Sequence, residues 1–214
     1  MKRKFFLLFT LIFTIVLTSL SSLSVSASWR NGIIYEWYSD ENEIRKWENG
    51  RPTIWAGNLG TGGFTNTEFN SYVTHGRSQW TAAGIPTTLV TSDGANANIR
   101  IYGGTYSVLK SIYTWLDSDV NGTAVYTGGA TFLGTLKYGS TYKNMYYANP
   151  PVNVYVISKN RTADQYKKTF THEIGHALGW KGHSPHPSDI MYHAGSSVTG
   201  LTFRDKNHLK QVYD

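Results

Sequence analysis

The chain has 214 residues, a formal net charge of +6 at pH 7 and no cysteine. Three cations lie within residues 2–4, and the remaining 17 basic and 14 acidic residues are too balanced and too scattered to indicate a nucleic-acid-binding protein. The lack of cysteine excludes a disulfide framework, so the fold must depend on an apolar core or on bound metal.

The first 27 residues have the layout of a secretory signal peptide. Basic residues precede an apolar run from Phe5 to Leu17, and small residues follow up to Ala27. The run is short of the roughly 20 apolar residues that a membrane-spanning helix needs. We therefore expect residues 1–27 to be removed on secretion, which leaves residues 28–214 as one extracellular, monomeric domain without a membrane anchor.

The first half of this domain contains one expected strand and one expected helix. Alternating apolar and polar residues predict a strand over residues 31–39. A helix is expected over residues 65–84, because Thr65 and Glu68 form a capping-box pair ahead of an apolar face. His75 lies inside this helix, where we expect a surface or packing role.

The middle of the chain is rich in strand signals. Strands are expected over residues 97–104, 123–134 and 152–160. Residues 106–116 fit either a strand or a short helix. The tyrosine-rich residues 135–151 are expected to form a loop.

Two more helices are expected toward the end of the chain. Thr162 and Gln165 provide a capping box for a helix that runs into a histidine-rich segment. Thr202 and Asp205 suggest the start of a C-terminal helix. Strands interleaved with helices in this order indicate a mostly parallel α/β sheet.

The segment THEIGHALGWKGH holds three of the seven histidines. On a helix, His172 and His176 leave the same face one turn apart, so both can reach one ion. Gly179 can adopt a positive φ, end the helix and turn the chain so that His183 faces that ion. Three neutral histidines leave a fourth coordination position for water, which is typical of a catalytic zinc.

Glu173 lies between the first two histidines in sequence, about 100° around the helix axis. It is therefore close to the metal but poorly placed to bind it, which suits a general base that activates water for attack on a peptide carbonyl. With this composition, H-E-x-x-H-x-x-G-x-x-H should arise by chance roughly 2 times in 100,000 sequences. The motif is therefore a specific signal.

This motif, followed by Met191 in SDIMY, resembles the metzincin zinc peptidases and, within them, the matrixins. Ser184 after the third histidine and Tyr192 after the methionine match the matrixin pattern, and LTFRDKNHLKQVY is similar to the matrixin terminal helix. The resemblance is specific over residues 170–192 and only topological before them.

The resemblance implies an α/β (α+β) fold with a twisted five-stranded, mostly parallel sheet, one antiparallel edge strand, three helices and a cleft with zinc at its floor. It assigns zinc ligation to His172, His176 and His183, and catalysis to Glu173. It places Met191 beneath the ligands as a hydrophobic base that does not coordinate.

We expect a peptide substrate to pair with the edge strand, placed within residues 128–134, and residues 192–200 to wall the pocket for the side chain after the cut. The chain also departs from the matrixin pattern. No histidine lies between His75 and His172, so a second, structural zinc is not expected. Without cysteine, latency through a cysteine on the zinc is excluded.

A calcium site is a further candidate. Asp117, Asp119 and Asn121 follow the start of a calcium loop, but Gly128 stands where an EF-hand needs glutamate. These three residues could still bind calcium, as many matrixins do. The alternative is an Asx-rich turn.

The sequence also leads to expectations for the remaining histidines and to two alternative functions. His186 and His193 are expected at the rim of the site, and His208 has no evident partner. The alternatives to a peptidase are a secreted zinc-binding module without catalysis and a zinc hydrolase of non-protein amides. An intact Glu173 and the lack of a fourth protein ligand favour the peptidase.

Overall fold

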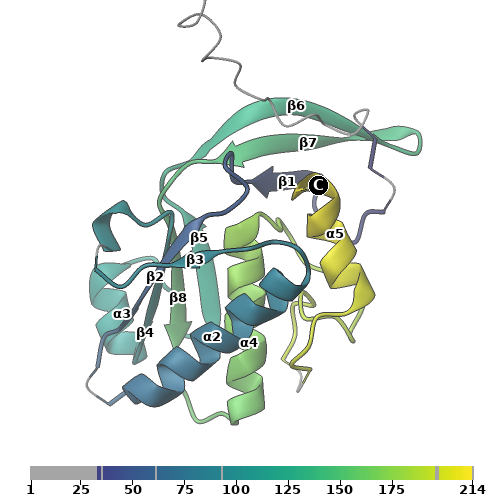
Figure 1. Ribbon diagram of the computed structural model, residues 1–214. Coiled ribbons are helices and arrows are strands. Elements are labelled where there is room, and N and C mark those ends of the chain that lie inside the picture. Colours follow the sequence, from purple (N-terminus) through teal and green to yellow (C-terminus); the bar gives the residue numbers. More distant parts are fainter. Residues whose placement is uncertain (1–32, 35, 61, 93, 196–197, 214) are drawn as a thin grey trace, which may run out of the picture. The chain divides into compact units, whose positions relative to one another are not determined.

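The structure is a computed structural model (Figure 1), and it describes residues 33–34, 36–60, 62–92, 94–195 and 198–213. The expected signal peptide, residues 1–27, lies outside these described residues. Within them, no helix is both long enough and apolar enough to cross a membrane.

The fold is mixed α/β, built on a five-stranded sheet. In spatial order its strands are β3 (Thr88–Leu89), β2 (Thr53–Asn58), β4 (Ile99–Gly104), β8 (Val152–Ile157) and β5 (Gly122–Tyr126). All neighbouring pairs are parallel except β5 with β8, so the expected mostly parallel sheet with one antiparallel edge strand is confirmed. The interior strand β8 is almost continuously buried, as in sheets covered by helices on both faces.

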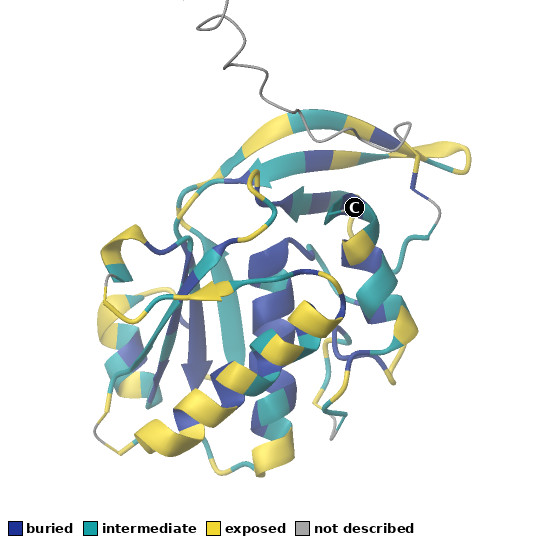
Figure 2. Cartoon of the chain, in the orientation of Figure 1, coloured by how far each residue is buried: buried dark blue, intermediate teal, exposed yellow. Residues whose placement is uncertain are grey.

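Helices cover both faces of this sheet (Figure 1). Helices α2 (Asn66–Ala82) and α4 (Ala163–Leu178) pack against each other on one face, and α3 (Tyr106–Ile112) packs on the other. Leu109 of α3 joins a buried cluster with Tyr155 of β8. Burial is greatest along α4, whereas the outer side of α2 is exposed (Figure 2). The histidine-rich helix therefore lies in the core of the domain.

The described residues form four α-helices, one more than the three expected. The additional helix is α3, which resolves the ambiguous residues 106–116 as a short helix capped by Thr105. The fourth, α5 (Phe203–Tyr213), begins as expected, because Thr202 and Asp205 exchange backbone-to-side-chain hydrogen bonds. The capping boxes predicted for α2 and α4 are both present.

Close contact between α2 and α4 fixes the position of the motif helix. A Cβ at Gly76 would lie 2.9 Å from Ile174 Cδ1, so the glycine lets the two helices approach. The buried Trp80 indole donates to the Thr171 carbonyl at 2.8 Å, directly before the motif. An aromatic cluster between the two helices adds further packing.

A second sheet was not expected. Its strands are β1 (Glu43–Lys46), β7 (Thr141–Ala148) and β6 (Ala130–Tyr138), in that order. The loop predicted for residues 135–151 is therefore wrong, since most of these residues belong to a β-hairpin. Tyrosine and threonine favour strands, and Gly139, with φ +56°, provides the tight turn.

Two predicted strands are also corrected. Residues 123–134 do not form one strand, because β5 and β6 belong to different sheets and Gly128 and Gly129 form a turn between them. A Cβ at Gly128 would lie 2.2 Å from the Pro150 carbonyl oxygen, which explains the glycine. The described residues within 31–39 do not form the predicted strand. Ile33 makes an isolated bridge to the second sheet.

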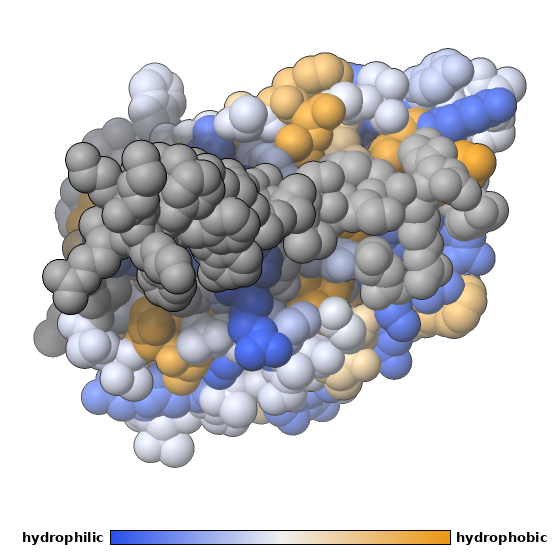
Figure 3. Space-filling model, turned by 45° about the horizontal axis from the view of Figure 1, so that its top comes forward, coloured by the Kyte–Doolittle hydropathy of each residue, from blue (hydrophilic) through white to orange (hydrophobic). Residues whose placement is uncertain are grey.

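Exposed apolar side chains are dispersed over the described surface. On the face shown in Figure 3, orange apolar groups lie in separate patches among polar ones. The large exposed apolar side chains come from different segments of the chain: Ile33, Leu89, Ile112, Trp115, Phe132, Tyr142 and Phe203. This dispersion is ordinary for a protein surface.

His208 on α5 has a buried environment that the sequence did not reveal. Its Nδ1 accepts the Tyr38 backbone N–H at 3.2 Å, and its ring lies 3.9 Å from the Trp180 ring. Burial lowers the pKa of His208 to about 3. Between about pH 3 and the ordinary value near 6.5 the unfolded chain therefore binds more protons than the folded one, so stability falls as the pH falls.

We predict that His208→Asn makes the chain less sensitive to acid. Asn can still accept the Tyr38 N–H but cannot take up a proton. Below about pH 6 the wild type should lose about 1.4 kcal/mol of unfolding free energy per pH unit more than the variant. Urea unfolding from pH 7 to pH 4, with chelator present, measures the difference. The exposed His186→Asn is the control. Equal slopes for His208→Asn and wild type would contradict the prediction.

Candidate metal centre

A glycine turn ends α4 and redirects the chain toward the site. Gly179 has φ +125°, and the Trp180 N–H donates to the Gly175 carbonyl at 3.1 Å. Arg45 of β1 donates its N–H to the Gly179 carbonyl at 2.9 Å. A Cβ at Gly179 would lie 1.9 Å from the Arg45 carbonyl oxygen, so only glycine fits here. The unexpected second sheet thus anchors the turn.

Beyond the turn, backbone pairing fixes His183. Asp40 donates its N–H to the His183 carbonyl at 3.0 Å, and its carboxylate accepts the His183 N–H at 2.5 Å. The His183 ring centroid then lies 5.3 Å from that of His172 and 5.1 Å from that of His176. The third predicted ligand therefore faces the other two.

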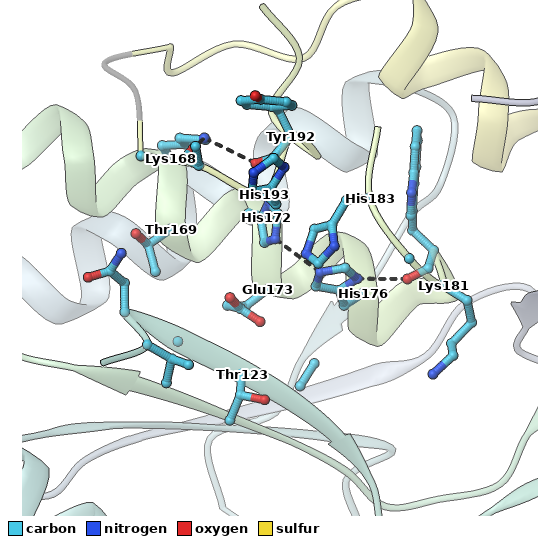
Figure 4. A pocket seen from close by; sticks show the side chains of 18 of the residues that line it. Thr123, Lys168, Thr169, His172, Glu173, His176, Lys181, His183, Tyr192 and His193 are labelled. Carbon is cyan, nitrogen blue, oxygen red and sulfur yellow. Dashed lines mark hydrogen bonds between the residues drawn. The ribbon is translucent and has the colours of Figure 1, made fainter. Parts of the chain in front are cut away.

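The three histidines form a group able to hold a metal ion (Figure 4). One nitrogen of each ring lies within 4.8 Å of the others, and no second such group of histidine, aspartate or glutamate occurs in the described part of the chain. The Nε2 atoms of His172 and His176 are 3.0 Å apart. Two nitrogens on a tetrahedral zinc are separated by about 3.3 Å, given metal–nitrogen distances of about 2.0–2.1 Å. The group is therefore close to a metal-binding geometry.

Backbone carbonyls set the protonation of two of these rings. The Nδ1 atoms of His172 and His176 lie 2.8 Å from the carbonyl oxygens of Ile190 and Trp180, respectively. A carbonyl can only accept, so each Nδ1 carries the proton and each Nε2 of a neutral ring presents a lone pair. Two lone pairs at 3.0 Å repel each other unless a cation lies against both. The donor set therefore fits a metal ion.

Burial also keeps these imidazoles neutral. It lowers the pKa of His172 well below its ordinary value and that of His176 to about 4. The pKa of His183 is lowered by the same cause. Near pH 7 the three rings are therefore free bases, which is the form that binds metal.

A tight turn around Met191 packs against the helix that carries two of the histidines. Met191 is fully buried, and a Cβ at Gly175 would lie 2.6 Å from its Sδ, so the methionine packs directly against α4. The Asp205 carboxylate accepts the N–H groups of Ile190 at 2.9 Å and Met191 at 3.2 Å. The Ser184 N–H donates to the Met191 carbonyl at 2.9 Å. The start of α5 therefore holds this turn in place.

Glu173 is a buried carboxyl group with an unsatisfied oxygen. Its Oε2 has no hydrogen-bond partner, and burial raises its pKa to about 8. A Cβ at Gly122 would lie 2.8 Å from Glu173 Cγ, so the glycine lets β5 pass close to the carboxyl group. Glu173 thus lies between the histidines and the edge strand.

A cavity of about 630 Å³ joins these groups. It is lined by the three histidines, Glu173, β5 residues including Thr123, and Tyr192 to Gly195 of the segment expected to wall a pocket. The edge strand beside the site is β5, so its placement within residues 128–134 is wrong. That segment begins β6 of the other sheet, because the turn at Gly128 diverts the chain.

The remaining histidines lie where expected or nearby. His193 lines the cavity with its ring 6.2 Å from that of His183, whereas His186 is exposed. His75 contacts the Thr199 carbonyl at 2.8 Å and is absent from the cavity lining. Sequence reasoning missed Arg161 and Lys168, which line the cavity but belong to no motif.

The calcium candidates lie on an exposed loop before β5. The Asp117 carboxylate accepts the Asp119 N–H at 2.9 Å, which is an Asx turn. Asp117 and Asp119 are exposed, and Asn121 is half-buried at the cavity. The local conformation needs no ion, and calcium binding stays a prediction.

Comparison with protein-family models and with curated proteins gives no match to this chain. The metal-binding argument therefore depends on the donor geometry around His172, His176 and His183. The resemblance to the metzincins stays a prediction from the motif and the C-terminal sequence.

We predict that Gly179→Ala destabilises the chain and weakens metal binding. The methyl group would meet the Arg45 carbonyl in a backbone conformation unfavourable to alanine. The expected loss of unfolding free energy is more than about 3 kcal/mol. Gly139→Ala, also at positive φ but in open space, should cost only about 1 kcal/mol. Urea unfolding compares them, and equal losses would contradict a specific role for Gly179.

We predict one tightly bound zinc ion per chain, lost in His183→Ala. Removing one of three ligands leaves an incomplete site. The matched control is His186→Ala, which removes an exposed histidine three residues away and should keep the metal. Zinc content after dialysis, measured by mass spectrometry, gives the result. Retention of zinc by His183→Ala together with loss in His186→Ala would overturn the ligand assignment.

Proposed function

We propose that this chain is a secreted, zinc-dependent endopeptidase, matrixin-like among the metzincins, that hydrolyses peptide bonds of extracellular proteins. The observation that carries the proposal is a buried, unpartnered Glu173 carboxyl oxygen in the same cavity as three histidines able to hold a metal. Purely structural zinc sites are closed by four protein ligands, and three are gathered here.

His172, His176 and His183 would each hold the ion through one ring nitrogen. When bound, zinc supplies a Lewis acid that makes water nucleophilic near neutral pH and polarises a carbonyl group. The carbonyls of Ile190 and Trp180 orient two of the imidazoles for this role. Their hydrogen bonds also increase the basicity of the ligand nitrogens.

Glu173 would act as general base and then as general acid. Without a nearby cation, burial favours its protonated form, since its pKa is about 8. A positive charge in the histidine group opposes this shift and brings the carboxyl group toward the operating pH, where proton transfer is most efficient. The carboxylate would accept a proton from the attacking water and return it to the leaving amine nitrogen.

The free edge of β5 would bind the substrate. Among the described strands this one pairs only with β8, so its other edge can hydrogen-bond an extended peptide. Gly122, Thr123 and Ala124 line the cavity beside Glu173. Tyr126 of the same strand donates its hydroxyl to the His176 carbonyl at 2.5 Å, which ties the edge to the motif helix.

Secretion is proposed from residues 1–27. An oxidising extracellular location is compatible with a chain that contains no cysteine. We further propose that the enzyme acts as a monomer, because the described residues contribute all three histidines and Glu173 to one cavity.

We predict that Glu173→Ala retains zinc and loses peptidase turnover. The side chain is not in the ligand group, so metal binding should persist, whereas loss of the base should lower kcat by about 100-fold or more. Cleavage of a quenched fluorescent peptide library, with zinc content measured in parallel, tests both statements. Chelator should abolish wild-type cleavage, and added zinc should restore it.

The same experiment separates the alternatives. Zinc retention without any wild-type peptide cleavage would support a non-catalytic module. Turnover of small amides without cleavage of peptides would support a different zinc hydrolase. Most of the activity surviving in Glu173→Ala would refute the proposed base.

A further inference from the structure

The cavity continues past Glu173 into a region with two cationic side chains. Arg161, Lys168, Thr169, Ala194 and Gly195 line it, and we call this group the cationic subsite. In Figure 4, Lys168 and Thr169 lie to one side of Glu173, and Lys181 lies to the other. The subsite is therefore one end of the cavity, next to the reacting groups.

Helical spacing sets the distance from this subsite to the metal centre. Lys168 is one turn before the ligand His172, and Thr169 is one turn before Glu173. Side chains four apart lie on the same helix face, about 5–6 Å from each other. The cationic subsite is therefore about as far from the metal centre as the next side chain of a bound peptide would be. At that distance its residues cannot replace a metal ligand or the base.

Hydrogen bonds fix both cations in this position. The Lys168 ammonium donates to the carbonyls of Tyr192, at 3.3 Å, and Ala194. The Arg161 guanidinium donates to Thr169 Oγ1 at 2.9 Å. Lys168 is only 4 % exposed, and burial lowers the pKa of both cations. The charges are therefore preorganised and partly removed from water.

No carboxylate of the described residues lies in direct contact with either cation. Neither Lys168 nor Arg161 has an ion pair there, whereas the neighbouring Lys167 pairs with Asp164 at 3.0 Å. Asp205 offsets part of the charge of Lys168 through space, but its oxygens accept the N–H groups of Ile190 and Met191 and it forms no ion pair with Lys168.

The other acids of the cavity do not pair with these cations either. Within the described part of the chain, Glu173 forms no ion pair, and its Oε2 has no hydrogen-bond partner. Asp119 is exposed at the rim, where Ser118 donates to it. Asp40 and Glu41 lie beside Gly182, at the end of the cavity marked by Lys181. The cationic subsite therefore keeps a net positive charge, and an anionic ligand would offset the cost of burying it.

We propose that the cationic subsite selects substrates with an aspartate or glutamate side chain directly after the scissile bond. This inference rests on the proposed peptidase function and on the expectation that the segment from Tyr192 walls the pocket after the cut. Lys168 and Arg161 line one cavity and repel each other electrostatically, and a carboxylate suits such a pair because it can accept charge-assisted hydrogen bonds from both. An apolar side chain would leave both cations without an anion.

The test compares capped peptides that differ only in Glu or Gln after the scissile bond. The peptides are acetylated at the N-terminus and amidated at the C-terminus, so that neither terminus is charged. The Glu carboxylate is then the one charge by which the two peptides differ. For the zinc-loaded wild type, kcat/KM should be at least about tenfold higher with Glu, mainly through KM, as expected for charge-assisted hydrogen bonds. Equal kcat/KM values with efficient cleavage would overturn the subsite and leave the peptidase intact.

Substitutions locate the preference in the subsite. Lys168→Met and Arg161→Gln should each reduce the Glu preference by about tenfold. Lys167→Met removes a cation from the same helix but outside the cavity lining, and should keep the preference. Arg161→Glu should shift the preference toward Lys or Arg. A preference that survives both Lys168→Met and Arg161→Gln would contradict the inference, as would a preference for acid before the cut.

A binding measurement gives a readout that does not need catalysis. Zinc-loaded Glu173→Gln should bind the Glu peptide at least about tenfold more tightly than the Gln peptide by titration calorimetry. If the wild type cleaves no peptide but this difference is present, the cationic subsite stands and the peptidase proposal falls. Equal affinities for the two peptides would overturn the subsite.

Discussion

The structure depends on one constraint, the approach of two buried imidazole nitrogens to 3.0 Å. Each ring is oriented by a carbonyl that accepts its Nδ1 proton, so both rings direct lone pairs at the same point. Burial opposes protonation, which would otherwise relieve the repulsion by a hydrogen bond. A divalent cation would satisfy both nitrogens at once, and the group therefore fits a metal ion.

Three distant parts of the chain maintain this constraint. Packing of α2 on α4 holds the helix that carries His172 and His176. Strand β1 holds the glycine turn from which the chain reaches His183. The start of α5, through Asp205, holds the turn whose Ile190 carbonyl orients His172. The geometry of the histidine group is therefore a property of the whole domain rather than of the motif alone.

The sequence predicted the parts that depend on local rules. Capping pairs at Thr65 and Thr162 and the glycine at 179 follow from backbone chemistry, and the histidine spacing follows from helix geometry. The second sheet was missed, although Gly139 and Ser140 between two tyrosine-rich runs are a hairpin signal. No sequence motif indicated that Lys168 and Arg161 lie at the site. Their proposed importance depends on which side chains share their cavity, and that depends on the fold.

Zinc-edge X-ray absorption of the purified protein tests the central claim most directly, because it counts the ligands around the ion. The expected spectrum shows four light-atom ligands at about 2.0–2.1 Å, three of them with the multiple-scattering pattern of imidazole. A spectrum with two imidazoles, or with four protein ligands that close the coordination sphere, would contradict an open site made of His172, His176 and His183.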